Sequence, residues 1–403
     1  MNHNDENRAI PESNRNGAAY FTKLAEKYHV AKYVMIVVLA VMILFTAIFG
    51  SSELKSENFK YFFKYFQINP FSSSASYSDI TFTGNPDMKF SMYKGDLVSL
   101  CDGTMTIYSI SGRVQLSVEA GNADTIESDG KYLALYRRGG NTATLYNSFS
   151  DVHTINCNYP ITDIDVSADG GFAVVTSEKD SRSSVLVYSK AFSLIYTWKS
   201  ADKYVSSAEL SDNGKCIGIF AYGTENGIPF SELIVRKTGS DTSVISEKYR
   251  GESPYYVLFS GDGGVISVTD KAVRFYSQSG EKRGEKIFGK TLSDVCFSEG
   301  KLVFALADAG YSGTNILIIS DKGEEKESFR IDDRIYAIRS DESNTAFLGY
   351  GKIYIKGTCE GETEISGGAL DMFVLDENDV LLCYTYGTEL AKISSAGKGG
   401  KDG

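Results

Sequence analysis

The chain has 403 residues, 42% of them hydrophobic and 12% aromatic, which is enough to bury a large core. Its net charge is −11; residues 1–52 carry five Lys or Arg and four Asp or Glu, which leaves −12 on the remainder. An acidic surface repels phosphate backbones, so nucleic acid is excluded as an expected partner. With only three histidines, zinc sites and Ser-His-Asp triads are not expected. We therefore predict no catalytic residue, no metal and no cofactor.

An uncharged apolar stretch runs from Tyr33 to Ser52. A membrane-spanning helix needs about 20 such residues, whereas a cleaved signal peptide has a shorter apolar core and a small-residue cleavage site. No Ala-x-Ala site follows this stretch. We predict a largely disordered cytoplasmic tail over residues 1–30 and one uncleaved transmembrane helix over residues 31–52.

Residues 53–77 are predicted to form a juxtamembrane aromatic helix and a linker. Phe59–Phe66 interleaves six aromatic residues with two lysines, which is typical of a membrane interface. When Arg8 and Arg15 are counted, the segment before the span carries more positive charge than the segment that follows it. We therefore expect a single-pass protein of the cell membrane, with a cytoplasmic N-terminus and an extracytoplasmic main domain.

Residues 78–396 repeat one pattern of apolar strands and tight turns eight times. The spacing of roughly 35–50 residues is the period of a four-stranded propeller blade. The pattern predicts an all-β fold, an eight-bladed β-propeller of four-stranded antiparallel blades, with seven blades as the alternative. The last repeat lacks a fourth strand, and Ile80–Phe82 is expected to supply it and close the ring. Residues 397–403 are predicted to be a disordered tail. The repeated Ser/Asp/Gly-rich turns lie at residues 94–96, 128–130, 167–170, 211–214, 260–263, 298–300, 340–343 and 376–379.

The connections between second and third strands differ in length. Most are short, but residues 177–183, 222–230 and 307–314 form long ones, and irregular loops tend to carry function. In propellers these connections share a face with the links between blades. Their aromatic and charged residues predict a partner-binding rim, although unselected drift of surface loops is the alternative. The rim residues are Arg182, Trp198, Asp202, Lys203, Tyr204, Tyr222, Glu225, Phe230 and Tyr311.

Four carboxylates are candidates for lining the central channel: Asp124, Glu127, Asp163 and Asp165. Asp163 and Asp165 are two residues apart in a strand, so their side chains point to the same face. A solvated channel wall is the favoured interpretation, and a carboxylate pair for glycoside hydrolysis is the alternative. Sensing of a small ligand in the channel is a third function, which the sequence neither supports nor excludes.

Three stretches carry a family resemblance: Leu133–Gly140, Ile164–Thr176 and Trp198–Val205. With these residues the chain resembles an uncharacterised family of membrane-anchored β-propeller proteins of Gram-positive bacteria. The resemblance implies an anchored propeller with no assigned activity, and it transfers no catalytic residue. We expect a non-enzymatic scaffold or sensor that binds another protein of the bacterial cell envelope. A carbohydrate-active or cell-wall enzyme is the alternative.

Overall fold

The computed structural model describes residues 79–392 except 110, 129, 299, 309, 311–312, 342 and 376–378, and also residues 32–33, 36–37 and 39–40. The chain divides into two compact units, residues 1–71 and 72–403. Residues 32–33, 36–37 and 39–40 are helical and exposed. Within the described part of the chain, no helix combines the length and apolarity that crossing a membrane requires. The predicted tails, most of the predicted span and all of the segment 53–77 lie outside the described residues.

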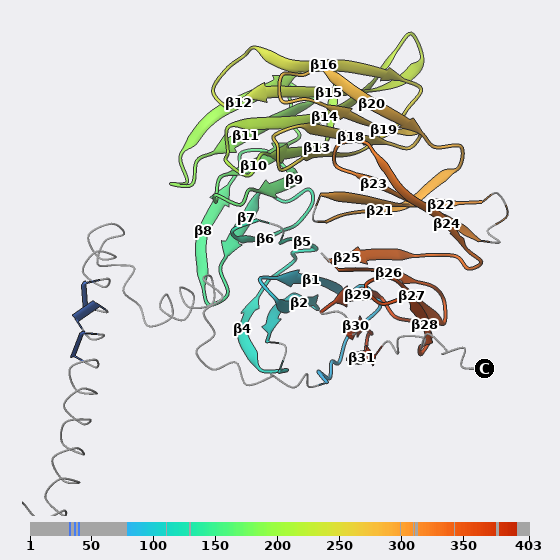
Figure 1. Ribbon diagram of the computed structural model, residues 1–403. Coiled ribbons are helices and arrows are strands. Elements are labelled where there is room, and N and C mark those ends of the chain that lie inside the picture. Colours follow the sequence, from blue (N-terminus) through green and yellow to red (C-terminus); the bar gives the residue numbers. More distant parts are fainter. Residues whose placement is uncertain are drawn as a thin grey trace, which may run out of the picture. The chain divides into compact units, whose positions relative to one another are not determined.

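The second unit is a β-propeller of eight antiparallel sheets, arranged as blades around an axis (Figure 1). The first four blades have four strands each, hydrogen-bonded in chain order. Their strands are β1 (Lys89–Tyr93), β2 (Asp96–Cys101), β3 (Thr104–Tyr108) and β4 (Val114–Glu119); β5 (Thr125–Glu127), β6 (Leu133–Tyr136), β7 (Thr142–Tyr146) and β8 (Asp151–Asn156); β9 (Ile161–Val166), β10 (Phe172–Thr176), β11 (Ser183–Tyr188) and β12 (Leu194–Ser200); β13 (Tyr204–Leu210), β14 (Cys216–Glu225), β15 (Ile228–Lys237) and β16 (Ser243–Arg250).

Blades five to seven also have four strands, whereas the eighth has three. The prediction of eight blades is therefore confirmed over the alternative of seven. The strands are β17 (Pro254–Phe259), β18 (Val265–Thr269), β19 (Ala272–Tyr276) and β20 (Lys282–Ile287); β21 (Thr291–Ser298), β22 (Lys301–Ala307), β23 (Thr314–Ser320) and β24 (Glu325–Ile331); β25 (Ala337–Ser340), β26 (Asn344–Leu348), β27 (Lys352–Gly357) and β28 (Gly361–Glu364); β29 (Asp371–Val374), β30 (Asp379–Cys383) and β31 (Thr388–Lys392).

The core lies between neighbouring blades, and this explains why the second strands are almost uniformly apolar. Every residue of β10 and of β18 is buried, because each strand has a strand on either side and a blade against each face. The outer strand β20 is exposed along nearly its whole length and is correspondingly polar.

The ring is closed by the N-terminal end of the propeller, as predicted, but through a shorter contact than a full strand. Thr81 forms an isolated antiparallel bridge with Gly387, just before β31. The Phe82 amide donates to the Tyr386 carbonyl at 2.9 Å, and the Thr388 amide donates to the Ile80 carbonyl at 2.8 Å. First and last blades are thus tied together by backbone hydrogen bonds.

Candidate functional site

The propeller has two faces that are built from different connections. Because successive strands are antiparallel, the links between blades and the turns between second and third strands lie at one end of the blades. We call this end the connection face. The turns between first and second strands and between third and fourth strands lie at the other end, which we call the turn face.

Large exposed apolar side chains gather on the connection face. Every exposed tyrosine in the described part of the propeller lies in or beside a connection of this face. On the turn face the exposed large apolar residues are confined to the starts of two outer strands, at Val114, Leu194 and Ile195. The connection-face tyrosines are Tyr204, Tyr222, Tyr255, Tyr256, Tyr336, Tyr350 and Tyr386.

The turn face, in contrast, is made of turns whose polar groups satisfy one another. In the β9–β10 turn the Ser167 hydroxyl donates to Asp169 at 2.6 Å, and the Gly171 amide donates to the same carboxylate at 2.8 Å. Gly170 has φ of +95°, a backbone conformation that favours glycine. The β17–β18 turn repeats this geometry, with 2.6 and 2.9 Å hydrogen bonds to the Asp262 carboxylate.

The predicted long connection 222–230 is a strand extension and not a loop. β14 and β15 have ten residues each and pair from Cys216↔Lys237 to Glu225↔Ile228. Asn226 and Gly227 both have positive φ, at 52° and 80°, as a two-residue type I′ hairpin requires. The sequence therefore builds a rigid hairpin where an irregular loop was expected.

Three of the predicted rim residues form a stacked group beside this hairpin. Tyr204 and Tyr222 are cross-strand partners whose rings stack with centroids 5.6 Å apart. The Arg182 guanidinium lies 5.1 Å from the centre of the Tyr204 ring. Both tyrosines are 42% exposed, so the group presents a flat aromatic surface with an attached cation.

The charged rim residues are engaged in local interactions. Glu225 bridges Lys248 at 3.2 Å and Arg250 at 3.0 Å, which fixes the side of the hairpin. Lys203 pairs with Glu232 at 3.0 Å. The Ser200 hydroxyl donates to Asp202 at 2.7 Å, and this hydrogen bond lowers the pKa of the Asp202 carboxyl.

Two predicted rim residues are buried, and a third is outside the described residues. Trp198 is 6% exposed and belongs to the core between the third and fourth blades, because alternation along β12 turns Tyr196 and Trp198 inward together. Phe230 of β15 is 5% exposed, and its ring lies beside Gly223 and under the Lys248 ammonium of its own blade. Tyr311 lies outside the residues that the structure describes.

Two of the predicted channel carboxylates connect neighbouring blades. Asp163 and Asp165 in β9 accept hydrogen bonds from the Ala208 amide at 3.4 Å and the Leu210 amide at 2.7 Å, both in β13. Asp294 in β21 likewise accepts from the Ile338 amide in β25 at 2.8 Å. An innermost strand has amides with no strand partner on its channel side, and these carboxylates satisfy them.

The other two predicted carboxylates serve local hydrogen bonds. Asp124 accepts from the Arg138 amide at 3.0 Å, and Glu127 accepts from the Ser128 amide at 3.1 Å. Burial raises the pKa of Asp163 to about 6, while the Ala208 amide and Arg138 act in the opposite direction. The structure gives these four groups roles in hydrogen bonding within and between blades.

Five tyrosines of the connection face were not predicted from the sequence: Tyr255, Tyr256, Tyr336, Tyr350 and Tyr386. They lie beside short connections, which loop length alone does not single out. The sequence does carry a signal for them. Each of these tyrosines lies in a segment that joins two strands, or within the first three residues of the strand that follows it. Connection-face position, and not loop length, marks the exposed aromatic residues.

Eight antiparallel blades with aromatic side chains on one face define the molecule as an eight-bladed β-propeller. The model of a family of unknown function (DUF5711) matches residues 69–393, and the chain belongs to this family. The predicted resemblance to an uncharacterised propeller family is thus confirmed at that level. No curated protein matches the chain in sequence.

Solved structures show the same fold at low identity. The chain is similar to the propeller of Dos1, with 11% identity, a TM-score of 0.51, and coverage of 71% of this chain and 80% of that one. It is also similar to the dihydro-heme d1 dehydrogenase NirN in complex with DHE, with 15% identity, a TM-score of 0.50, and coverage of 76% and 70%. These likenesses establish the propeller fold alone.

Proposed function

We propose that this chain is a membrane-tethered, non-enzymatic scaffold or sensor whose connection face binds another protein of the bacterial cell envelope. The observation that carries the proposal is the confinement of exposed tyrosines to that face. Tyrosine supplies a large contact area at a small cost in side-chain entropy, and it is enriched in the residues that dominate protein interfaces.

The binding surface is best developed on the third and fourth blades. There the stacked Tyr204 and Tyr222, the Arg182 cation and the exposed Ile228 of the β14–β15 hairpin lie on one end of adjacent blades. Arginine and tyrosine are typical anchors of interface hot spots. The salt bridges of Glu225 hold the hairpin, so little ordering entropy remains to oppose association.

The tether in this proposal rests on the uncharged stretch Tyr33–Ser52 and on the positive charges that precede it. Fractionation of cells with alkaline carbonate, followed by protease treatment of intact cells with the wall removed, tests it. We expect the chain to stay in the membrane pellet and its propeller to be degraded from outside. Extraction by carbonate, or complete protection from external protease, would refute this arrangement.

The interaction is tested by crosslinking in cells and affinity capture of three forms of the full chain. These are the parent, Tyr204→Ser/Tyr222→Ser on the connection face, and Leu194→Ser/Ile195→Ser on the turn face. The two double variants remove comparable exposed apolar surface, because all four side chains are 42–53% exposed. A partner caught by the parent and the Leu194/Ile195 variant but lost from the tyrosine variant supports the proposal. Loss from both variants, or from neither, argues against it.

A further inference from the structure

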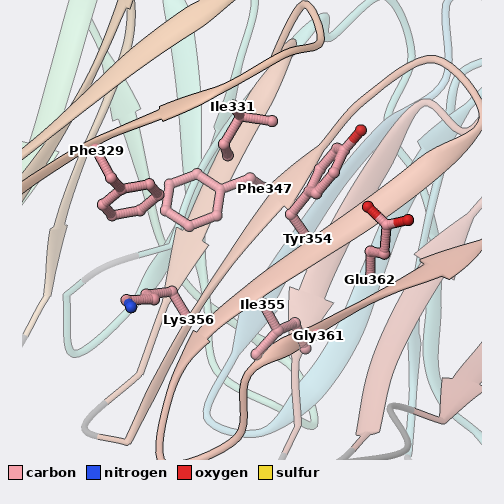
Figure 2. Close-up of a pocket in the computed structure, with 8 residues that line it drawn as sticks. All are labelled: Phe329, Ile331, Phe347, Tyr354, Ile355, Lys356, Gly361 and Glu362. Atoms are coloured by element: carbon pink, nitrogen blue, oxygen red, sulfur yellow. The ribbon is translucent and has the colours of Figure 1, made fainter. Parts of the chain in front are cut away.

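A cavity of about 310 Å³ opens between the sixth and seventh blades. Its apolar wall consists of Phe329 and Ile331 from β24 and Phe347 from β26, and the rings of Phe329 and Phe347 meet edge to face at 5.9 Å. Figure 2 shows these rings side by side, with Tyr354 and Glu362 on the other side and Lys356 below. A volume of this size is at the lower end for ligand pockets.

This junction lacks an aromatic cluster that another junction has. Between the second and third blades, Phe172 stacks on Tyr188 at 4.7 Å, and Phe192 of the following turn stacks on His153 at 4.5 Å. In the register of the third blade, Phe172 of β10 pairs on one side with Val166, the last residue of β9, and on the other side with Tyr188 of β11.

In the seventh blade the corresponding pairs place Thr345 and Lys356 where Phe172 and Tyr188 stand in the third. The turn that follows is Thr358-Cys359-Glu360, with no aromatic residue to take the place of Phe192. These two junctions therefore fill the corresponding space differently: the second and third blades with aromatic rings, the sixth and seventh with Lys356 paired to Glu327 and Glu360.

The polar groups at the mouth of the cavity are already paired with one another. Lys356 lies 3.1 Å from Glu327 and 2.8 Å from Glu360, Lys352 lies 2.7 Å from Glu362, and the Tyr354 hydroxyl donates to Asp333 at 3.2 Å. Among the residues that line the cavity, Lys356 and Glu362 are each paired within the chain, so the remaining lining favours an apolar group. An apolar side chain delivered by a longer chain needs no polar group to orient it.

The edge of the seventh blade offers backbone groups and charge that select such a chain. β28 is the last strand of its sheet, so one edge has no strand partner within the described residues. Its Glu362 and Glu364 point to the same face, next to the cavity, and are exposed. Counting Glu327 and Glu360, four glutamates face two lysines, an excess of two negative charges.

We propose that this junction binds an extended, basic peptide segment of a partner protein. The segment adds as a strand to the edge of β28, places an aromatic or large aliphatic side chain in the cavity against the apolar wall, and places Lys or Arg two positions away beside Glu362 and Glu364. The alternation of a strand puts the apolar anchor and the flanking cations on one face. The cavity is lined by none of the exposed connection-face tyrosines, so the site is tested independently of the proposed function.

Fluorescence anisotropy with the purified full chain tests the proposal. The probe is a fluorescein-labelled peptide Thr-Lys-Thr-Phe-Thr-Lys-Thr, compared with one that has Ala in place of Phe and one that has Glu in place of both Lys. We expect saturable binding of the probe and at least about tenfold weaker binding of the Ala peptide, since a buried Phe side chain is lost. No saturable binding, or equal binding of the Ala peptide, would overturn the proposal.

Protein variants locate the binding to this junction. Glu362→Lys/Glu364→Lys is expected to weaken the Lys peptide about tenfold and to favour the Glu peptide, and Phe329→Ala is expected to weaken the Phe peptide. Glu119→Lys changes an exposed glutamate on the outer strand of the first blade and is the matched control. Because Glu362 and Glu364 are exposed, their replacement tests binding without threatening the fold. Unchanged binding by both variants would place the peptide elsewhere and refute the site.

Discussion

The connection face and the turn face are formed by the two ends of the same strands, yet they present different chemistry to solvent. The turn face consists of short turns in which serine, aspartate and glycine bond to one another, as in Ser167, Asp169 and Gly171. The connection face exposes tyrosine rings that the fold does not need to cover, such as Tyr336 and Tyr350. The polar groups at one end of the blades are therefore satisfied within the fold, whereas the other end leaves apolar surface exposed, as the proposed binding requires.

The contrast between the two faces divides their side chains into two groups, according to whether a substitution should change stability or binding. A side chain that satisfies a backbone amide should affect the free energy of unfolding and leave binding intact. An exposed ring that contacts little of its own chain should do the reverse. The four predictions below follow this division, from the largest expected effect on stability to the smallest.

Asp165→Ala should lower the free energy of unfolding by about 3 kcal/mol, because it leaves the Leu210 amide without its 2.7 Å acceptor between two blades. Chemical denaturation monitored by circular dichroism measures the loss. Asp165→Asn keeps an acceptor oxygen and should recover most of the stability. Full stability of the Ala variant would show that the carboxylate does not join the blades.

Asp163 should make stability depend on pH with the opposite sign to most acids. Its pKa is raised from 3.8 to about 6 by burial, so the folded state keeps its proton where the unfolded state has released it. The stability that comes from this retained proton is fully present below pH 3.8 and is lost as pH rises through about 6. As the pH rises from 3.8 to about 6, the free energy of unfolding of the parent should fall by about 2 kcal/mol relative to that of Asp163→Asn. This figure allows for the partial exposure of the Asp163 side chain. Parallel pH profiles of the two forms would contradict this.

Asp169→Ala should destabilise the β9–β10 turn by about 1 kcal/mol, since the Ser167 hydroxyl and the Gly171 amide both lose their acceptor on a partly exposed surface. The midpoint of thermal unfolding measures the effect. Partner capture should be unchanged. If capture were lost while stability held, the turn face would be part of the binding surface.

Tyr204→Ser/Tyr222→Ser should change the free energy of unfolding by less than about 1 kcal/mol, because both rings are 42% exposed. The same denaturation experiment provides the measurement, with Leu194→Ser/Ile195→Ser as the control. A loss of several kcal/mol would mean that the stacked rings stabilise the fold, and the division between the two faces would no longer hold.

Much of the fold could be predicted from the sequence because it is repetitive. The spacing of the Ser/Asp/Gly turns predicts eight blades, and the missing strand after Lys392 predicts closure by Ile80–Phe82. The candidate rim was predicted only in part. Loop length selects the blades beside the stacked Tyr204 and Tyr222. It also predicts Trp198 on the surface, whereas Trp198 alternates along β12 in phase with the buried Tyr196.

Features that depend on how blades meet could not be predicted from one repeat at a time. The hydrogen bonds of Asp163 and Asp165 could not be predicted, because the amides of Ala208 and Leu210 lie in a later repeat. The cavity beside Phe347 is likewise formed by residues of two blades, so one repeat read alone does not indicate it.

The most direct test of the division between the two faces is photocrosslinking in living cells from single positions on each. A photoreactive phenylalanine analogue replaces Tyr204 or Tyr350 on the connection face, or Leu194 or Ile195 on the turn face, all of them exposed in the parent. We predict that a discrete protein adduct forms from one or both connection-face positions and from neither turn-face position. Adducts from the turn face alone, or equally from both faces, would contradict the account.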